Sequence, residues 1–159
     1  MEIGIGQKYG FKVNNFQIPT NAGAAMNIFE LLAAASIPVL IQRFVITSAS
    51  STAQTVPVSV QIRSAAGSGG STTLAGTDAE PPSGSNATET LAYNVTTQGG
   101  SLVKEVAAAF WQIFMPYEFN RKPGGLLITP GNVFCLATPA TGVGTAFNAS
   151  IEGEYIALK

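Results

Sequence analysis

The chain lacks histidine altogether and contains a single cysteine and few charged residues. Without histidine, no side chain has an ordinary pKa near neutral pH, so Ser-His-Asp and Cys-His nucleophile systems are excluded, as is nearly every zinc site. A lone cysteine, Cys135, forms no internal disulfide, and its apolar neighbours in NVFCLAT predict a buried small side chain. We therefore expect no enzyme, no cofactor and no metal.

Charge is scarce as well. Charged residues make up 11% of the 159, against about 25% in an ordinary soluble domain, and the net charge is −1. Such a surface gives little electrostatic protection against association. Two explanations compete: a surface buried against copies of the chain or a larger assembly, and an extracellular β-protein with a neutral polar surface. The N-terminus, MEIGIGQKYG, has no basic region and no hydrophobic core of a secretory signal, which favours the first.

The most apolar stretch, residues 27–50, is not a membrane anchor. Only eleven uncharged residues separate Glu30 from Gln42, whereas a spanning helix needs about 20 apolar residues. Apolar residues at i, i+3, i+4 and i+7 predict a short helix with Asn27 as its N-cap and Glu30 three residues later. The β-branched and aromatic run VLIQRFVIT predicts a strand covered on nearly both faces.

The rest of the chain shows strand patterns separated by Gly, Pro and Ser. Residues 55–63 alternate with the clearest period of two, and Pro57 suggests an edge strand. A strand is also predicted over 107–118, apolar on both faces and therefore covered by something. About eight strands and one short helix predict an all-β, antiparallel eight-stranded sandwich, most simply a jelly roll. We divide the chain into an extended N-terminal arm, 1–25, and a sandwich domain, 26–159, with a long Gly/Ser-rich loop at about 64–87.

Candidate chemistry is sparse. AGSGGS in the long loop lacks the Lys-Ser/Thr of a phosphate-binding P-loop. Asp78 and Glu80 are candidate calcium ligands without EF-hand spacing, and the pair Glu152 and Glu154 is most simply a solvated strand edge. Arg121 and Lys122 are the only adjacent basic pair, and the pI near 5.3 argues against nucleic-acid binding.

Aromatic and apolar side chains are the better candidates, because such residues anchor protein interfaces. For Phe110 and Phe114 we expect the sandwich core. For the arm, core and interface are equally open. The predicted partner-binding residues are Ile3, Ile5, Tyr9, Phe11, Phe16, Trp111 and Met115.

The order of these segments resembles a known family. The arm is followed by NIFELLAAASIPVLIQRFVIT, the Gly/Ser-rich loop, ITPGNVFCLATP and a terminal IEGEYIAL strand. This pattern resembles the small single-jelly-roll structural proteins of tailed bacteriophage capsids, in particular decoration or cement proteins. The resemblance implies a homo-oligomer, often a trimer, that binds the major capsid protein on the virion surface and has no catalytic residues. It also implies synthesis in the host cytoplasm without a signal peptide.

The first functional hypothesis is therefore a capsid decoration protein that stabilises the shell by bridging subunits, without binding nucleic acid or membrane. The alternative is a carbohydrate- or cell-surface-binding module of a fibre or adhesin, in which the long loop and Tyr93 or Tyr117 contact sugars. A third possibility, a shell-forming capsid protein, is disfavoured because the chain has no basic arm to hold a genome.

Overall fold

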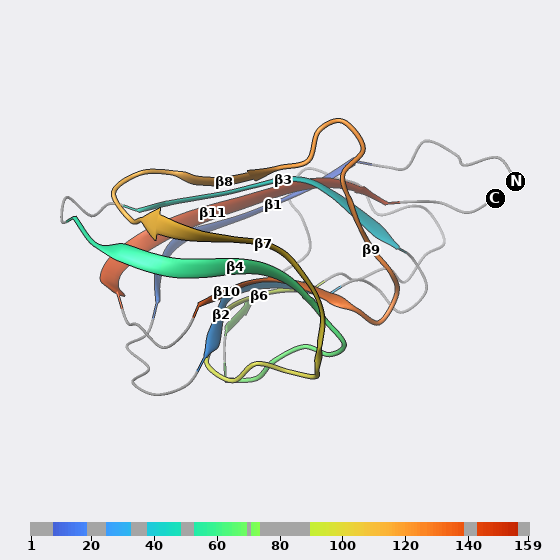
Figure 1. The fold of residues 1–159 in the computed structure, drawn as a ribbon, viewed down its shortest axis with the longest axis horizontal. Helices are drawn as coiled ribbons and strands as arrows, with labels where there is room; N and C mark the ends of the chain where they lie inside the picture. Colours follow the sequence, from blue (N-terminus) through green and yellow to red (C-terminus); the bar gives the residue numbers. More distant parts are fainter. Residues whose placement is uncertain are drawn as a thin grey trace, which may run out of the picture.

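The computed structural model describes residues 8–18, 25–32, 38–48, 53–69, 71–73, 90–138 and 143–155, and it is all-β across them (Figure 1). These residues form eleven strands and no helix, where the sequence predicted eight strands and one helix. The strands are β1 Lys8–Ile18, β2 Met26–Leu32, β3 Val39–Ser48, β4 Thr55–Arg63, β5 Ser71–Thr73, β6 Thr90–Val95, β7 Leu102–Gln112, β8 Tyr117–Asn120, β9 Leu126–Ile128, β10 Val133–Thr138 and β11 Val143–Tyr155.

The strands form two antiparallel sheets that lie one above the other in Figure 1. One sheet has five strands. Four follow the order β1-β11-β3-β8, and the fifth, β9, pairs with residues 39–41 at the start of β3, whereas β8 pairs with residues 43–46. The second has six, in the order β5-β6-β2-β10-β4-β7. From β1 to β4, each strand lies in the opposite sheet from the one before it, so the first four strands bind the two layers together.

Aromatic rings join the sheets. Phe44, from the five-stranded sheet, lies 5.1 Å from Phe29 and 6.2 Å from Phe134 of the other sheet, measured between ring centroids. All three side chains are fully buried. Burying a large aromatic side chain of this kind contributes about 1.5–3 kcal/mol. Phe44 therefore sits at the centre of the core that holds the sheets together.

The predicted helix is wrong over the residues described. Met26–Leu32 forms β2, a central strand between β6 and β10. Relative to β10, β2 has one extra residue at Ile28, so Asn27 and Glu30, three apart, lie on the same outer face. The predicted N-cap Asn27 does contact Glu30, since Asn27 Nδ2 donates to Glu30 Oε1 at 3.3 Å, but this contact forms across an irregularity in a strand and not at the start of a helix. Pairing with two neighbours overrode the local helical spacing.

Other predictions were closer. The alternation in β4 is confirmed, with four buried side chains between half-buried or exposed ones, and β3 has one buried and one half-buried face. The strand predicted over 107–118 is broken by a turn at 113–115 between β7 and β8. Within the predicted long loop, Ser71–Thr73 forms β5 and Ser68 bridges to Thr97, while 74–89 lie outside the described residues.

Part of the predicted arm belongs to the sheet. Residues 8–18 form β1, an edge strand that pairs antiparallel with β11 from Lys8↔Glu154 to Ile18↔Val143. This portion of the arm does not lie outside the sandwich. The boundary between an arm at 1–25 and a domain at 26–159 stays a prediction. No helix among the described residues has the length and apolarity to cross a membrane.

Candidate interaction surface

β7 is the most exposed strand whose side chains the structure describes. It ends the six-stranded sheet and pairs with β4 over nearly its whole length, while no strand in the described part of the chain pairs with its other side. Of its eleven residues, Trp111 alone is buried. An edge strand presents backbone N–H and C=O groups that another chain can use.

The direction of those groups follows from one hydrogen bond. Ile113 N donates to Gln54 O, in register with the β4–β7 pairs. Hydrogen-bonded and non-hydrogen-bonded pairs alternate along an antiparallel ladder. The backbone groups of Ala107, Ala109 and Trp111 therefore face β4. Those of Ala108, Phe110 and Gln112 face the outer edge of the sheet.

The two halves of β7 differ. Relative to β4, its first half has extra residues at Val103 and Val106 and carries Lys104 and Glu105. Bulges and charges are the usual protection of a sheet edge against unwanted pairing. Its second half, Ala107–Gln112, has a regular register and no charge. The second half of β7 is therefore the part of this edge to which a further strand could pair.

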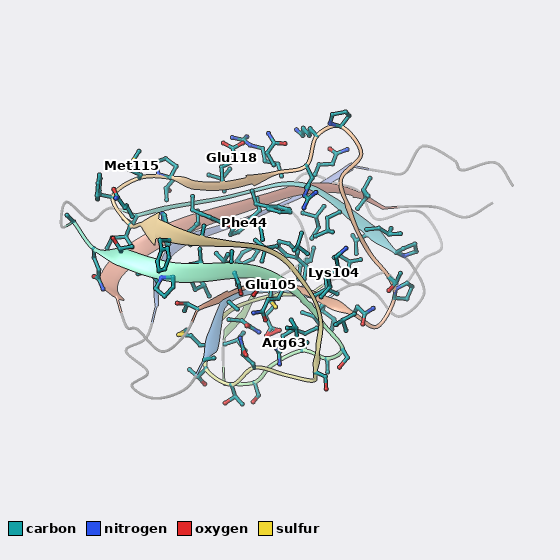
Figure 2. All side chains as sticks on the ribbon, viewed as in Figure 1. Phe44, Arg63, Lys104, Glu105, Met115 and Glu118 are labelled. Atoms are coloured by element: carbon teal, nitrogen blue, oxygen red, sulfur yellow. The ribbon has the colours of Figure 1, made fainter. Side chains whose placement is uncertain are left out.

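Exposed apolar side chains gather at the same strand. Of the six large hydrophobic side chains found exposed among the described residues, five lie on β7 or in the turn after it, and Met115 of that turn is labelled in Figure 2. Phe110 is the extreme case, at 80% exposure. The six are Leu102, Val103, Phe110, Phe114, Met115 and Leu127.

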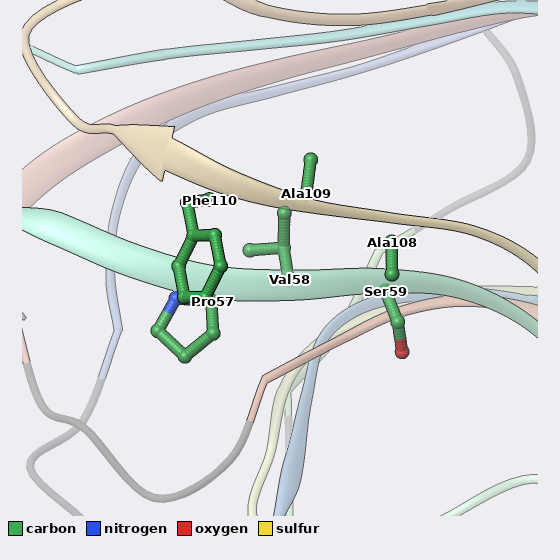
Figure 3. A pocket seen from close by; sticks show the side chains of 6 residues that line it. All are labelled: Pro57, Val58, Ser59, Ala108, Ala109 and Phe110. Carbon is green, nitrogen blue, oxygen red and sulfur yellow. The ribbon is translucent and has the colours of Figure 1, made fainter.

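A pocket lies beside Phe110 on the outer face of β4 and β7 (Figure 3). It measures about 280 Å³ and is lined by Pro57, Val58, Ser59, Ala108, Ala109 and Phe110. Because Ser59 pairs with Ala108 on one side and with Ala137 on the other, a row of three small residues crosses β7, β4 and β10. A second, more polar hollow of about 200 Å³ adjoins the first at Ser59 and reaches Gln61 and Gln98.

At β2, two strands away from β4, other segments of the chain cover the outer face of the same sheet. Glu30 on β2 is 2% exposed, and its carboxylate accepts hydrogen bonds from Gly67 N at 2.9 and 3.0 Å and from Asn27 Nδ2. Asn27 in turn accepts from Gln98 Nε2 at 3.0 Å. The segments around Gly67 and Gln98 therefore cover β2 on its outer side.

Arg63 and Cys135 belong to the same closed region. The Arg63 guanidinium donates to Gly99 O and Gly100 O at 2.7 and 2.9 Å, which holds the covering segment against β4. Burial, with the negative charge of Glu30 as a second cause, raises the pKa of the Cys135 thiol to about 12. Cys135 is fully buried, as predicted. A thiol with so high a pKa is a poor nucleophile.

The predicted partner-binding residues separate into three groups. Trp111 is 3% exposed, its ring centroid lies 6.3 Å from that of Tyr117, and its Nε1 donates to Met115 O, so the folded chain itself covers this side chain. Met115 is 54% exposed, and its role in binding a partner stays a prediction. By register, Tyr9, Phe11 and Phe16 of β1 stand opposite Gly153, Ile151 and Phe147 of β11, and Ile3 and Ile5 lie outside the described residues.

Phe110 and Phe114 were missed. Both were predicted to lie in the core, and that prediction is wrong, because they are 80% and 46% exposed. The signal that could have found them is Gln112. It shares the alternating set of Phe110 and Phe114, and a polar residue in such a set marks its outer face.

The remaining candidates are the predicted calcium ligands, the basic pair and the predicted sugar-binding tyrosine Tyr117. Among the described residues, no group of three or more potential ligands could hold a metal ion, and Asp78 and Glu80 lie outside those residues. Arg121 lies over the Phe119 ring at 5.5 Å. Tyr117 is half-buried against Phe44, and burial raises the pKa of its phenol. It is therefore a poor platform for stacking a sugar.

Comparisons with known proteins place this chain in no family. No protein-family model and no curated protein matches it. One solved chain, from the crystal structure of the T13 IBDV viral particle, aligns with 97% of this chain and 40% of its own length, at 12% identity and a TM-score of 0.20. This chain thus spans well under half of that one.

Proposed function

We propose that this protein is a structural component of a viral particle, a jelly-roll decoration or cement protein of a bacteriophage. It attaches to the outer surface of the capsid and stabilises the shell by bridging subunits. The observation that carries the proposal is the edge at β7, which no other strand of the described part of the chain covers. Five of the six large hydrophobic side chains found exposed among those residues lie on this strand or in the turn after it. Monomeric proteins rarely expose large contiguous apolar surfaces unless they serve as interaction sites.

The strand order supports the jelly roll. Leaving out the short β5 and the added β6, the four-strand order β2-β10-β4-β7 faces the order β1-β11-β3-β8 in the other sheet. Two four-stranded sheets connected in this alternating way are the arrangement expected of a double Greek key. β5 and β6 then extend one sheet beyond β2, as an addition between the strands β4 and β7.

The proposed mechanism is burial of apolar strand surface combined with strand-edge pairing. A partner that binds the folded assembled state and not the dissociated one makes disassembly more costly by mass action. The low charge of the chain fits this role, because it leaves little repulsion between copies or against a capsid. We propose a homo-oligomer with the major capsid protein as its partner.

The test is rebinding to particles of the virus that encodes the chain, after they have been stripped of the protein. We expect the purified protein to co-sediment with the particles and to raise the temperature at which they release their genome. The variant Phe110→Ser should bind less, and a matched change at an exposed site away from β7, Leu127→Ser, should bind as the unchanged protein does. If the protein stays in the supernatant with no effect on the particles, the proposal is wrong.

A further inference from the structure

The second half of β7 is complementary to itself. Its outer face carries a protruding ring, Phe110, and two residues away a small side chain, Ala108, that borders the pocket at Ser59. Its backbone groups at positions 108, 110 and 112 face the open edge, as derived above from the β4 ladder. A protrusion and a hollow two residues apart on one strand match each other when two copies run antiparallel.

We propose that β7 pairs antiparallel with β7 of a second copy of this chain, about a two-fold axis at Ala109. Phe110 then lies opposite Ala108 of the partner subunit, and its ring fills the pocket that this alanine shares with Ser59. The same contact occurs twice, as a two-fold axis requires. The two six-stranded sheets become one continuous sheet. This deepens the proposed function, on which it rests for its biological meaning, by naming a second copy as one partner of β7.

Charge and bulk select this register over its neighbours. An axis at Phe110 would set Gln112 of the partner subunit opposite Ala108, so no ring would fill the pocket at Ser59. An axis at Ala108 would set Phe110 against the irregularity at Val106, and Gln112 opposite the partner's Lys104. With the axis at Ala109, Lys104 and Glu105 stand opposite residues beyond the end of the partner's strand, so no charge is enclosed in the paired segment.

The same axis accounts for the other exposed apolar side chains. It directs the turn that carries Phe114 and Met115 toward the start of the partner's β7, where Val103 is 55% exposed. With the axis at Ala109, the regular paired segment is Ala107–Trp111, only five residues long, which is short for an interface in which each partner normally buries about 800 Å². We therefore expect a weak dimer in solution that forms as concentration rises, and a stronger contact where a lattice already holds the copies close.

Cysteine cross-linking tests the register. Residues at a non-hydrogen-bonded antiparallel pair have Cα atoms about 4.5 Å apart, within the range that a disulfide spans. Ala109→Cys should cross-link to itself under mild oxidation, and faster than Ala107→Cys, whose position faces residue 111 of the partner subunit and is too far from its own copy for a disulfide. The native Cys135 is fully buried and gives no background. Faster self-cross-linking at position 107, 108 or 110 than at position 109 would overturn the register.

Two further variants test the pairing itself. Ala108→Pro removes an N–H that faces the open edge, which sheet edges tolerate, so it should abolish the dimer while the circular dichroism spectrum stays unchanged. Phe110→Ser should also give a monomer. Native mass spectrometry of the unchanged protein should show one and two chains as concentration rises. Monomer at every concentration, or the three chains that the phage resemblance implies, would overturn the two-fold contact.

The outcomes separate this inference from the proposed function. A dimer with the expected cross-link from a protein that ignores capsid particles would leave the β7 contact standing and remove the virion role. A protein that binds particles but never cross-links at position 109 would support the virion role and overturn the β7 contact.

Discussion

Two glutamates in one row of the six-stranded sheet have opposite surroundings. Glu30 on β2 and Glu105 on β7 are joined through the cross-strand pairs Glu30↔Cys135, Cys135↔Gln61 and Gln61↔Glu105. Glu30 is buried under a covering segment that donates hydrogen bonds to it, whereas Glu105 is exposed. Within the described part of the chain, this outer face is therefore closed at β2 and open at β7. The open end is where a partner is expected.

The largest expected effect contrasts two neighbours on the open strand. Trp111→Ala removes a buried ring that packs on Tyr117 and should lower the free energy of unfolding by about 3–5 kcal/mol. Phe110→Ala, one residue earlier, removes a ring that is 80% exposed, and should change it by less than about 0.5 kcal/mol in dilute protein. Urea unfolding of both variants measures this, and equal effects would contradict the assigned faces of β7.

The second contrast uses the two glutamates. Glu30→Ala leaves Gly67 N and Asn27 Nδ2 without their acceptor and should cost about 3 kcal/mol. Glu105→Ala at the exposed end of the same row should cost less than about 0.5 kcal/mol. Urea unfolding again compares them. Similar costs would mean that the face is not closed at β2.

A smaller effect is expected at the covering segment. A Cβ added to Gly67 would meet Thr97 O and Val95 Cγ1 closely and lie 2.7 Å from Glu30 Oε1. Gly67→Ala should therefore destabilise the protein by about 1–3 kcal/mol through overpacking, whereas Ser68→Ala, at an exposed neighbour, should be neutral. Thermal unfolding checks the pair. An unchanged midpoint for Gly67→Ala would show that the segment does not press on β2.

The smallest effect concerns the other sheet, where Arg43 donates to Glu118 at 2.8 Å on the surface. This hydrogen bond, more than any other cause, lowers the pKa of Glu118 below its ordinary value of 4.5. A lowered folded-state pKa stabilises the fold above pH 4.5, and this stabilisation is lost as the pH falls through the folded-state pKa. Arg43→Gln should move the pKa of Glu118 back up, as an NMR titration would show. An unchanged pKa would contradict the assigned cause.

Period-two patterns were readable from sequence, and pairing across the sheets was not. β4 was found because Val56, Val58, Val60 and Ile62 all face the core of a one-sided strand. β2 was misread because it is buried on both faces, so its apolar residues show no period of two and happen to fit a helix.

The open surface was located on the correct strand and on the wrong face of it. The sequence predicted that the 107–118 strand is apolar on both faces and covered by something, and in the structure most side chains of β7 are exposed. It assigned Trp111 outward and Phe110 inward, because residue type alone favours tryptophan at interfaces. Which face of a strand is inward depends on the register with β4, and Gln112 was the only local sign of it.

The most direct test of an open β7 edge is amide hydrogen exchange measured by NMR at low and high protein concentration. The amides of Ala107 and Ala109 face β4 and should be protected at both concentrations. The amides of Ala108, Phe110 and Gln112 should exchange freely in dilute protein and gain protection as concentration rises. If these three are already protected in dilute protein, or gain nothing at high concentration, β7 is not an open edge that pairs with a second copy.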